Sequence, residues 1–324
     1  MERFEYANPT TIKDAQALLG NSWDDAQILA GGTDLISLMK DYVVSPKRVV
    51  NIKGVAELGK ITPSAAGVQI GATVSLDDLT LNRAVRDAYP SLVTAALGIA
   101  SPQIRNMGTV GGDLCQRPRC WYFRQGYGLL AMKDGKSLVP NGENRYHAIF
   151  GGGPAYFVSP SSLGPALIAL GAQVKIASPT ASRTVAADKF FVNPQSADMR
   201  EVDLKPNEIV TAIVIPSGAS KNATYEVRHK EALDWPLATA SVSLKMTGTK
   251  IASARVVLGH VAPTPWIAAG AEKWLVGKSI DEATAEAAGA AAVEGAKPLS
   301  QNEYKVQLAK IAVKRALLAA VAKA

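Results

Sequence analysis

Two glycine-containing segments place the strongest constraint on what this chain can fold into. The first glycine loop reads Leu29-Ala30-Gly31-Gly32-Thr33-Asp34-Leu35, and the second reads Ile104-Arg105-Asn106-Met107-Gly108-Thr109-Val110-Gly111-Gly112-Asp113. Each joins two adjacent glycines to a threonine and an aspartate. Glycine has no β-carbon to keep an anion from the backbone, and successive N–H groups in a turn can bind one. A single such loop is most often an ordinary turn, but two of the same design favour a diphosphate held from two sides.

The residues around the first glycine loop support this interpretation. A short predicted strand at 27–30 runs into the loop, and apolar residues at helical spacing follow it from Leu35 to Met39. Asp34 stands at the expected N-cap of this helix. A strand, a glycine turn and a helix start together direct N–H groups at a phosphate.

The composition indicates a folded protein with more than one domain. The chain has 324 residues, of which 48% are hydrophobic, which argues against disorder. Its net charge of +7 comes from scattered basic residues. This favours a mildly basic surface, with a docking face for an acidic partner as the alternative. No nucleic-acid recognition motif is present.

Targeting and metal-binding signals are absent from the sequence. The N-terminus has no apolar signal segment, and no stretch approaches the roughly 20 apolar residues of a membrane span. Two cysteines, Cys115 and Cys120, exclude a disulfide scaffold. The three histidines (His147, His229 and His260) have no metal-ligand spacing. We therefore expect a cytoplasmic protein without a metal site.

Hydrophobic periodicity predicts mixed helices and strands, followed by a separate C-terminal unit. Helices are expected at 11–19, 84–100 and 161–170, and strands at 48–52, 68–72, 173–177 and 209–216. After a linker at 216–220, three strands (223–228, 239–246, 251–258) precede three helices (265–275, 280–294, 302–322). This order predicts an α+β domain with an antiparallel sheet. The stretch 116–153 lacks periodicity, as functional segments or insertions often do.

The order of these signals resembles the FAD-binding medium subunit of the xanthine dehydrogenase and carbon monoxide dehydrogenase family, over essentially the whole chain. The resemblance is carried by both glycine loops and by Ala100-Ser101-Pro102-Gln103, Gly259-His260-Val261-Ala262-Pro263-Thr264-Pro265 and Lys314-Arg315-Ala316-Leu317. It implies an α+β fold with a PCMH-type, vanillyl-alcohol-oxidase-like FAD-binding domain of two α+β subdomains, 1–57 and 58–218. A small C-terminal domain of the CO-dehydrogenase-flavoprotein type, 222–324, follows.

The resemblance also implies which residues bind the cofactor. Both glycine loops contact the diphosphate and ribityl chain of FAD, and the hydroxyl groups of Thr33 and Thr109 donate hydrogen bonds. Asp113 stands where many relatives have asparagine, which places a charge near the diphosphate. Ser162 stands where relatives often have an aspartate that faces the cofactor.

Two further positions are implied to lie at the flavin. Val210 matches a residue that lines the flavin in relatives. Arg228 or Lys230 matches a basic residue near the isoalloxazine, where a cation stabilises the reduced, anionic flavin. No residue of this chain is expected to act as acid, base or nucleophile on the organic substrate.

The segment Gln116-Arg117-Pro118-Arg119-Cys120-Trp121-Tyr122-Phe123-Arg124 resembles a subgroup of aldehyde and hydroxybenzoyl-type dehydrogenases. Their medium subunits carry an inserted loop that holds a [4Fe–4S] cluster. Such a cluster normally needs four thiolates, and only Cys115 and Cys120 occur here. We therefore expect no cluster on this chain. The inserted loop, 116–153, is expected to have a structural role or to contact a partner subunit.

The expected function is electron transfer within a heterotrimer. A large subunit with molybdenum cofactor oxidises an aldehyde or N-heterocycle, and a small subunit with a [2Fe–2S] cluster passes the electrons to FAD on this chain. FAD then reduces an external acceptor. Co-export to the periplasm on a partner's signal is the alternative to a cytoplasmic location.

Two alternatives stay open at this point. The missing cluster cysteines, Asp113 and Ser162 allow a redox-inactive structural subunit, against which the intact first glycine loop argues. A stand-alone flavin oxidase of the vanillyl-alcohol-oxidase type would need a longer, more histidine-rich C-terminal part than this chain has.

Overall fold

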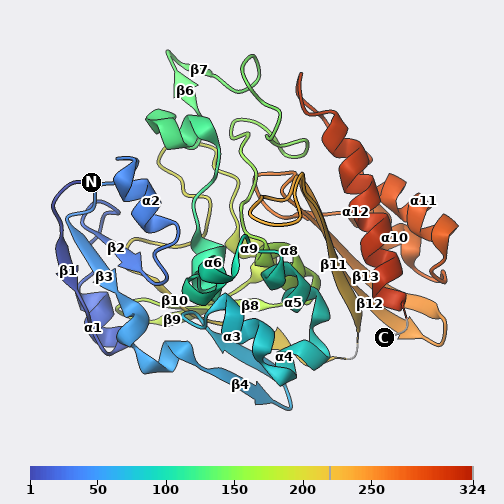
Figure 1. Ribbon diagram of the computed structural model, residues 1–324, viewed down its shortest axis with the longest axis horizontal. Helices are drawn as coiled ribbons and strands as arrows, with labels where there is room; N and C mark the ends of the chain where they lie inside the picture. Colours follow the sequence, from blue (N-terminus) through green and yellow to red (C-terminus); the bar gives the residue numbers. More distant parts are fainter. Residues whose placement is uncertain (219, 323–324) are drawn as a thin grey trace.

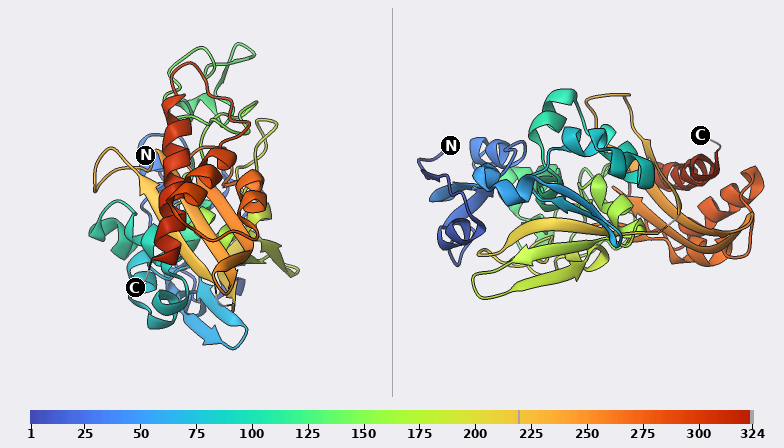
Figure 2. Two further views of the ribbon diagram at one scale, coloured as in Figure 1. Left: turned by 90° about the vertical axis from the view of Figure 1, so that its right-hand side faces the viewer. Right: turned by 90° about the horizontal axis from the view of Figure 1, so that it is seen from below.

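The computed structural model describes residues 1–218 and 220–322. Three main sheets follow one another along the sequence, and a small hairpin lies between two strands of the second sheet, β5 (Gly67–Gly71) and β8 (Gln173–Ala177). Figure 1 shows the N-terminal sheet at the left and the C-terminal sheet with its helices at the right. Figure 2 shows that the molecule is elongated, with the two chain ends far apart in its right-hand view. This arrangement confirms the α+β fold class expected from the sequence.

The N-terminal sheet has the strand order β1-β3-β2, and its strands are parallel. The strands are β1 (Glu5–Ala7), β2 (Ala26–Leu29) and β3 (Arg48–Asn51), and the helices are α1 (Ile12–Ala17) and α2 (Leu35–Lys40). Parallel strands need crossover connections, which α1 and α2 provide. Two 3₁₀ turns, η1 (Ile52–Gly54) and η2 (Ala56–Gly59), lead into the next sheet.

The middle sheet is antiparallel, with the order β4-β5-β10-β8-β9. Its strands are β4 (Ile61–Ser64), β5 (Gly67–Gly71), β8 (Gln173–Ala177), β9 (Ser182–Ala186) and β10 (Ile209–Pro216). The helices of this part are α3 (Leu76–Leu81), α4 (Arg83–Ala88), α5 (Pro90–Leu97), α6 (Pro102–Met107), α7 (Val110–Cys115), α8 (Leu163–Ala169) and α9 (Ala187–Phe190). β10 is central because its apolar run can be buried on both faces.

The C-terminal unit packs helices against one face of a four-stranded sheet. Its strands are β11 (Lys221–Val227), β12 (Ala238–Thr247), β13 (Lys250–Gly259) and β14 (Trp266–Ile267), and its helices are α10 (Ala269–Leu275), α11 (Glu282–Ala292) and α12 (Tyr304–Val321). Ala309, Ala312, Val313 and Ala316 are spaced three or four residues apart, so α12 buries one continuous stripe. Among the residues described, no helix combines the length and apolarity needed to cross a membrane.

Proline and strand pairing change three of the expected boundaries. The helix expected at 84–100 is two helices, because Pro90 has no N–H and starts α5 instead of continuing α4. The helix expected at 265–275 starts at Ala269, since Trp266 and Ile267 pair with β13. In the linker expected at 216–220, Pro216 still belongs to β10, and Ala219 lies outside the described residues.

The inserted loop is largely irregular, as expected. It contains one π-helical turn, η3 (Phe123–Tyr127), and the hairpin of β6 (Met132–Lys133) and β7 (Lys136–Ser137). In Figure 1 the hairpin projects from the top of the molecule. The end of the inserted loop nevertheless has a firm attachment to the C-terminal unit.

Lys305, on α12, makes this attachment. Its side chain is 1% exposed, and Nζ donates to the carbonyl oxygens of Tyr146 (3.2 Å), His147 (3.1 Å) and His260 (2.7 Å). Burial lowers the pKa of Lys305 to about 7. The amide of Asn302 donates to the His147 carbonyl as well, at 3.1 Å. The inserted loop and strand β13 are thus joined through one buried amine.

We expect Lys305→Met to lower the free energy of unfolding of the chain by about 1–3 kcal/mol, because buried carbonyl groups lose their donor. Urea unfolding of the purified chain measures the change. Lys310→Met is the matched control on the same helix, since Lys310 lies 4.0 Å from the exposed Glu286. Equal losses in the two variants would contradict the role given to Lys305.

Candidate functional site

Both glycine loops line one cavity of about 340 Å³, which is within the usual range for ligand pockets. Most of its wall comes from four parts of the chain: β2 and α2 with their flanking residues, the segment from Gly98 to Arg119, the segment from Arg200 to Val210, and Leu233 to Pro236. Ile52, Ala72, Leu76 and Ser162 complete it. The cavity therefore lies where the N-terminal sheet, the middle sheet and a loop of the C-terminal unit come together.

The two glycine loops contact each other through their backbones. A β-carbon on Gly31 would overlap the carbonyl oxygen of Met107, so only glycine allows this approach. Gly32 has a φ of +74°, a conformation that side chains other than glycine rarely adopt. At Gly111, an added β-carbon would lie 2.8 Å from the β-carbon of Ala72. The glycines thus set the distance between the loops and the sheet behind them.

The two loops differ in how their N–H groups are used. In the second loop, Gly108, Val110 and Gly111 donate to the carbonyl oxygens of Ile104, Val74 and Ala72, and Gly112 donates to the Thr109 hydroxyl. In the first loop, the N–H groups of residues 31–34 have no acceptor within the described residues. The four N–H groups of residues 31–34 are therefore available to an anion, whereas most of those in the second loop are already paired. That both loops contact the diphosphate stays a prediction.

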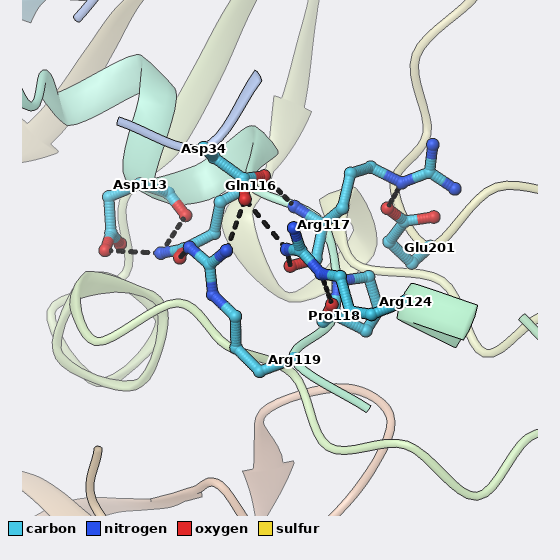
Figure 3. Close-up of polar contacts among 8 residues, drawn as sticks. All are labelled: Asp34, Asp113, Gln116, Arg117, Pro118, Arg119, Arg124 and Glu201. Atoms are coloured by element: carbon cyan, nitrogen blue, oxygen red, sulfur yellow. Dashed lines mark hydrogen bonds and ion pairs between the residues drawn. The ribbon is translucent and has the colours of Figure 1, made fainter. Parts of the chain in front are cut away.

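Asp34 does not cap α2 with its side chain, contrary to the sequence-based expectation. Its carboxylate instead accepts hydrogen bonds from the backbone N–H of Arg117 (2.7 Å) and from the guanidinium groups of Arg119 and Arg124. Figure 3 shows these three arginines around Asp34. Burial would raise the pKa of Asp34, but Arg119 and Arg124 outweigh it and lower the pKa. The cap is lost because two charged guanidinium groups and one backbone N–H compete better than the helix N–H groups.

Asp113 is held inside the protein and does not present a free carboxylate. It accepts from the Ser161 hydroxyl (2.5 Å), the Leu163 N–H (3.0 Å) and the Gln116 amide (2.9 Å). Burial raises the pKa of Asp113 to about 6, against the effect of these hydrogen bonds. The residue joins α7 to the start of α8, next to Ser162.

Most of the residues predicted from the sequence line the cavity together. These are residues 30–35 of the first loop, Ile104, Gly108, Thr109, Gly111, Gly112, Asp113, Ser162 and Val210.

Three predicted residues lie outside the cavity wall. Leu29 does not line the cavity, although its neighbours Ile28 and Ala30 do. Arg228 lies behind the wall, where its guanidinium donates to the carbonyl oxygen of Gly98 at 2.8 Å. Lys230 lies in the loop that approaches the cavity, and its backbone N–H bonds to Asp234. The structure therefore places neither basic residue in the cavity.

Sequence reasoning missed two arginine–aromatic pairs in the wall. Arg119 lies 4.7 Å from the ring centre of Trp235, and Arg200 lies 4.1 Å from that of Trp23. The arginine-rich composition of 116–124 was a usable signal for Arg119, since the buried Asp34 needs a cation. No local pattern marks Arg200 or Trp23, which are far apart in the sequence.

The inserted loop brings its cysteine to a histidine and not to a second cysteine. Cys120 Sγ lies 3.2 Å from His147 Nε2. Burial lowers the pKa of His147 to about 4 and raises that of Cys120, which makes this a neutral pair. Within 1–218 and 220–322, no three His, Cys, Asp or Glu side chains are grouped as metal ligands. The absence of a cluster stays a prediction.

Comparison with known proteins identifies two family domains that together cover the chain. Residues 2–218 match the FAD binding domain in molybdopterin dehydrogenase, and residues 223–320 match the CO dehydrogenase flavoprotein C-terminal domain. The carbon monoxide dehydrogenase medium chain of Hydrogenophaga pseudoflava is 31% identical over 99% of this chain and 98% of its own length. The aldehyde oxidoreductase FAD-binding subunit of Escherichia coli is 31% identical over 96% of each.

Solved structures show the same similarity in three dimensions. Carbon monoxide dehydrogenase from Hydrogenophaga pseudoflava has a TM-score of 0.77 and 30% identity, over 98% of this chain and 97% of the other. Quinoline 2-oxidoreductase from Pseudomonas putida has a TM-score of 0.77 and 27% identity over the same shares. The chain belongs to the family of FAD-binding medium subunits of molybdopterin-dependent dehydrogenases.

Proposed function

We propose that this chain is the FAD-binding, electron-transfer subunit of a molybdenum-containing dehydrogenase. The observation that carries the proposal is the cavity lined by both glycine loops, with backbone donors still available at residues 31–34. These donors suit the diphosphate of FAD, which needs hydrogen-bond donors and no β-carbons nearby. The residues present therefore fit the cofactor.

We further propose that different lining residues contact different parts of the cofactor. The first loop donates its N–H groups to the diphosphate, and Thr33 and Thr109 add their hydroxyl groups. Ser162 and Val210 complete the wall beside Asp113. FAD, when bound, supplies the redox chemistry, and the chain orients it and keeps water away. No side chain has to move a proton of the organic substrate.

The proposed partners are a large subunit with molybdenum cofactor and a small subunit with a [2Fe–2S] cluster. The relatives are named for carbon monoxide, aldehyde, glyceraldehyde, nicotine and quinoline enzymes, yet each contains a chain similar to this one. Because similar chains occur in enzymes with such different substrates, we propose that another subunit selects the substrate. An aldehyde or N-heterocycle is the substrate class that we propose here.

For the compartment we propose the cytoplasm, with the periplasm, reached by co-export with a partner, as the alternative. Cys115 and Cys120 are both free thiols, which suits a reducing environment. We also propose domain boundaries at 1–57, 58–218 and 222–324. Each segment contains one of the three main sheets, which supports this division.

The visible spectrum of the purified chain tests the proposed function most directly. We expect the absorption of oxidised flavin and the release of about one FAD per chain on acid denaturation. Absorption of an iron–sulfur cluster, bleached by dithionite, would contradict the expectation of no cluster. A folded, colourless chain that takes up no added FAD would favour a redox-inactive structural subunit instead.

Gly31→Val should abolish FAD retention, because its side chain would collide with the backbone at Met107 and separate the two loops. The paired change Gly111→Val and Gly112→Val should do the same. Flavin content per folded chain measures the loss. Gly59→Ala is the matched control, since its β-carbon would meet only the Thr73 hydroxyl at 3.7 Å. Normal flavin content in folded Gly31→Val would refute the role of the first loop.

Asp113→Asn should change how stability depends on pH. The folded-state pKa of about 6 exceeds the ordinary 3.8, so the folded chain binds this proton more tightly than the unfolded chain does. Its contribution to stability is present at low pH and is lost as the pH rises through about 6. As the pH rises from 4 to 7, the free energy of unfolding of the variant should increase relative to that of the wild type by on the order of 2 kcal/mol.

Urea unfolding of the wild type and of Asp113→Asn across this pH range gives the difference in their free energies of unfolding. The contributions of titrating groups that the two proteins share cancel in this difference. Asp134→Asn, in the exposed β6–β7 turn, is the control for the removal of one carboxylate. A constant difference for Asp113→Asn would show that this carboxyl group titrates normally.

A further inference from the structure

Arg200 is a cavity-lining cation without a hydrogen-bond acceptor within the described residues. Its side chain is 16% exposed, and Nε lies 3.7 Å from the carboxylate of Glu201, beyond hydrogen-bonding distance. The guanidinium instead stacks over Trp23, with Cζ 4.1 Å from the ring centre. A buried guanidinium that makes no hydrogen bond is costly unless a ligand supplies an acceptor.

The nearby carboxylate does not neutralise Arg200, because it is shared. Glu201 is 4% exposed and forms its close ion pair with Arg117, as Figure 3 shows. Two guanidinium groups therefore face one carboxylate, and one positive charge remains at the cavity wall. Burial, and then the neighbouring Arg117, lower the pKa of Arg200 to about 10, so the group stays protonated at neutral pH.

Backbone contacts fix the position of Arg200. The Val192 N–H donates to the Glu201 carbonyl oxygen at 2.9 Å, and Phe191 pairs with Val202 in an isolated β-bridge. Trp23, half-buried in the turn before β2, lies against the guanidinium of Arg200. Ile28, Ile52 and Pro206 are apolar residues of the same cavity. A fixed guanidinium, a flat aromatic ring and apolar walls together suit a nucleotide: phosphate oxygens for the cation and an apolar surface for the base.

We infer that Arg200 and Trp23 form the subsite for the adenosine-monophosphate half of FAD, with Arg200 donating to the phosphate attached to the adenosine and Trp23 packing beside the adenosine. The inference rests on the proposed function, since it assumes that this cavity holds FAD. It makes Arg200 a residue that selects FAD over flavins without the adenosine half. The donors of the first glycine loop and the Arg200 guanidinium then serve the same diphosphate.

Titrations of the full-length apo chain with FAD, FMN and ADP test this subsite. In Arg200→Gln we expect FAD and ADP to bind about 10–100-fold more weakly, the usual cost of a lost charge-assisted hydrogen bond. FMN binding should change less than about threefold. Trp23→Leu should weaken FAD and ADP binding by a smaller factor. Arg86→Gln, which removes an exposed charge on α4, is the control and should leave all three affinities unchanged.

Thermal unfolding of the apo chain separates binding from folding. Because Arg200 is buried without an acceptor, Arg200→Gln should leave the apo Tm unchanged or raise it while FAD affinity falls. Unchanged FAD affinity in Arg200→Gln, or equal losses for FAD and FMN, would overturn the subsite while leaving the proposed function intact. A wild-type chain that binds no FAD would refute the proposed function and the subsite with it.

Discussion

The carboxylate of Asp34 is the point on which the cavity depends. It sits in the first glycine loop, yet its acceptors are used by the inserted loop, through the backbone of Arg117 and the side chains of Arg119 and Arg124. Such charge-assisted bonds are strong where water is largely excluded. They fix the first loop against a segment that is more than eighty residues away in sequence.

The arginines that bind Asp34 also contact residues in two other parts of the cavity wall. Arg119 extends from Asp34 to Trp235 in the C-terminal unit, and Arg117 extends to Glu201 beside Arg200. Because Asp34 and Glu201 are already paired with other arginines, an anion that enters the cavity can meet Arg200, whose Nε has no hydrogen-bond acceptor in the chain. The N–H groups of residues 31–34 are likewise unused, whereas Gly108, Val110, Gly111 and Gly112 of the second loop donate to acceptors of the chain itself. The backbone N–H groups of the first loop and the guanidinium of Arg200 can thus donate hydrogen bonds to the same anionic ligand.

Local patterns were sufficient to predict most elements and both glycine loops. The strand at 209–216 agrees with β10 at both ends, because an apolar run bounded by turn residues determines its limits. What the sequence could not show were contacts between distant segments. Asp34 looked like an N-cap because its competing arginines come much later in the chain. Arg228 looked like a flavin contact by position alone, but its partner is the backbone at Gly98. Most residues implied by the resemblance line one cavity, and the three-dimensional contacts show which of them lie behind its wall.

The inserted loop is held in place by hydrogen bonds and aromatic contacts with the rest of the chain. One end is held by Asp34 next to the cavity, and the other is held by Lys305 and Asn302 in the C-terminal unit. Between them, Cys120 meets a neutral His147, and Trp121 packs edge-on against Tyr146 and His147. Hydrogen bonds and aromatic contacts therefore cross-link the loop at several points. Since the loop joins the first glycine loop to α12, it couples the position of the cofactor-binding backbone to the C-terminal unit.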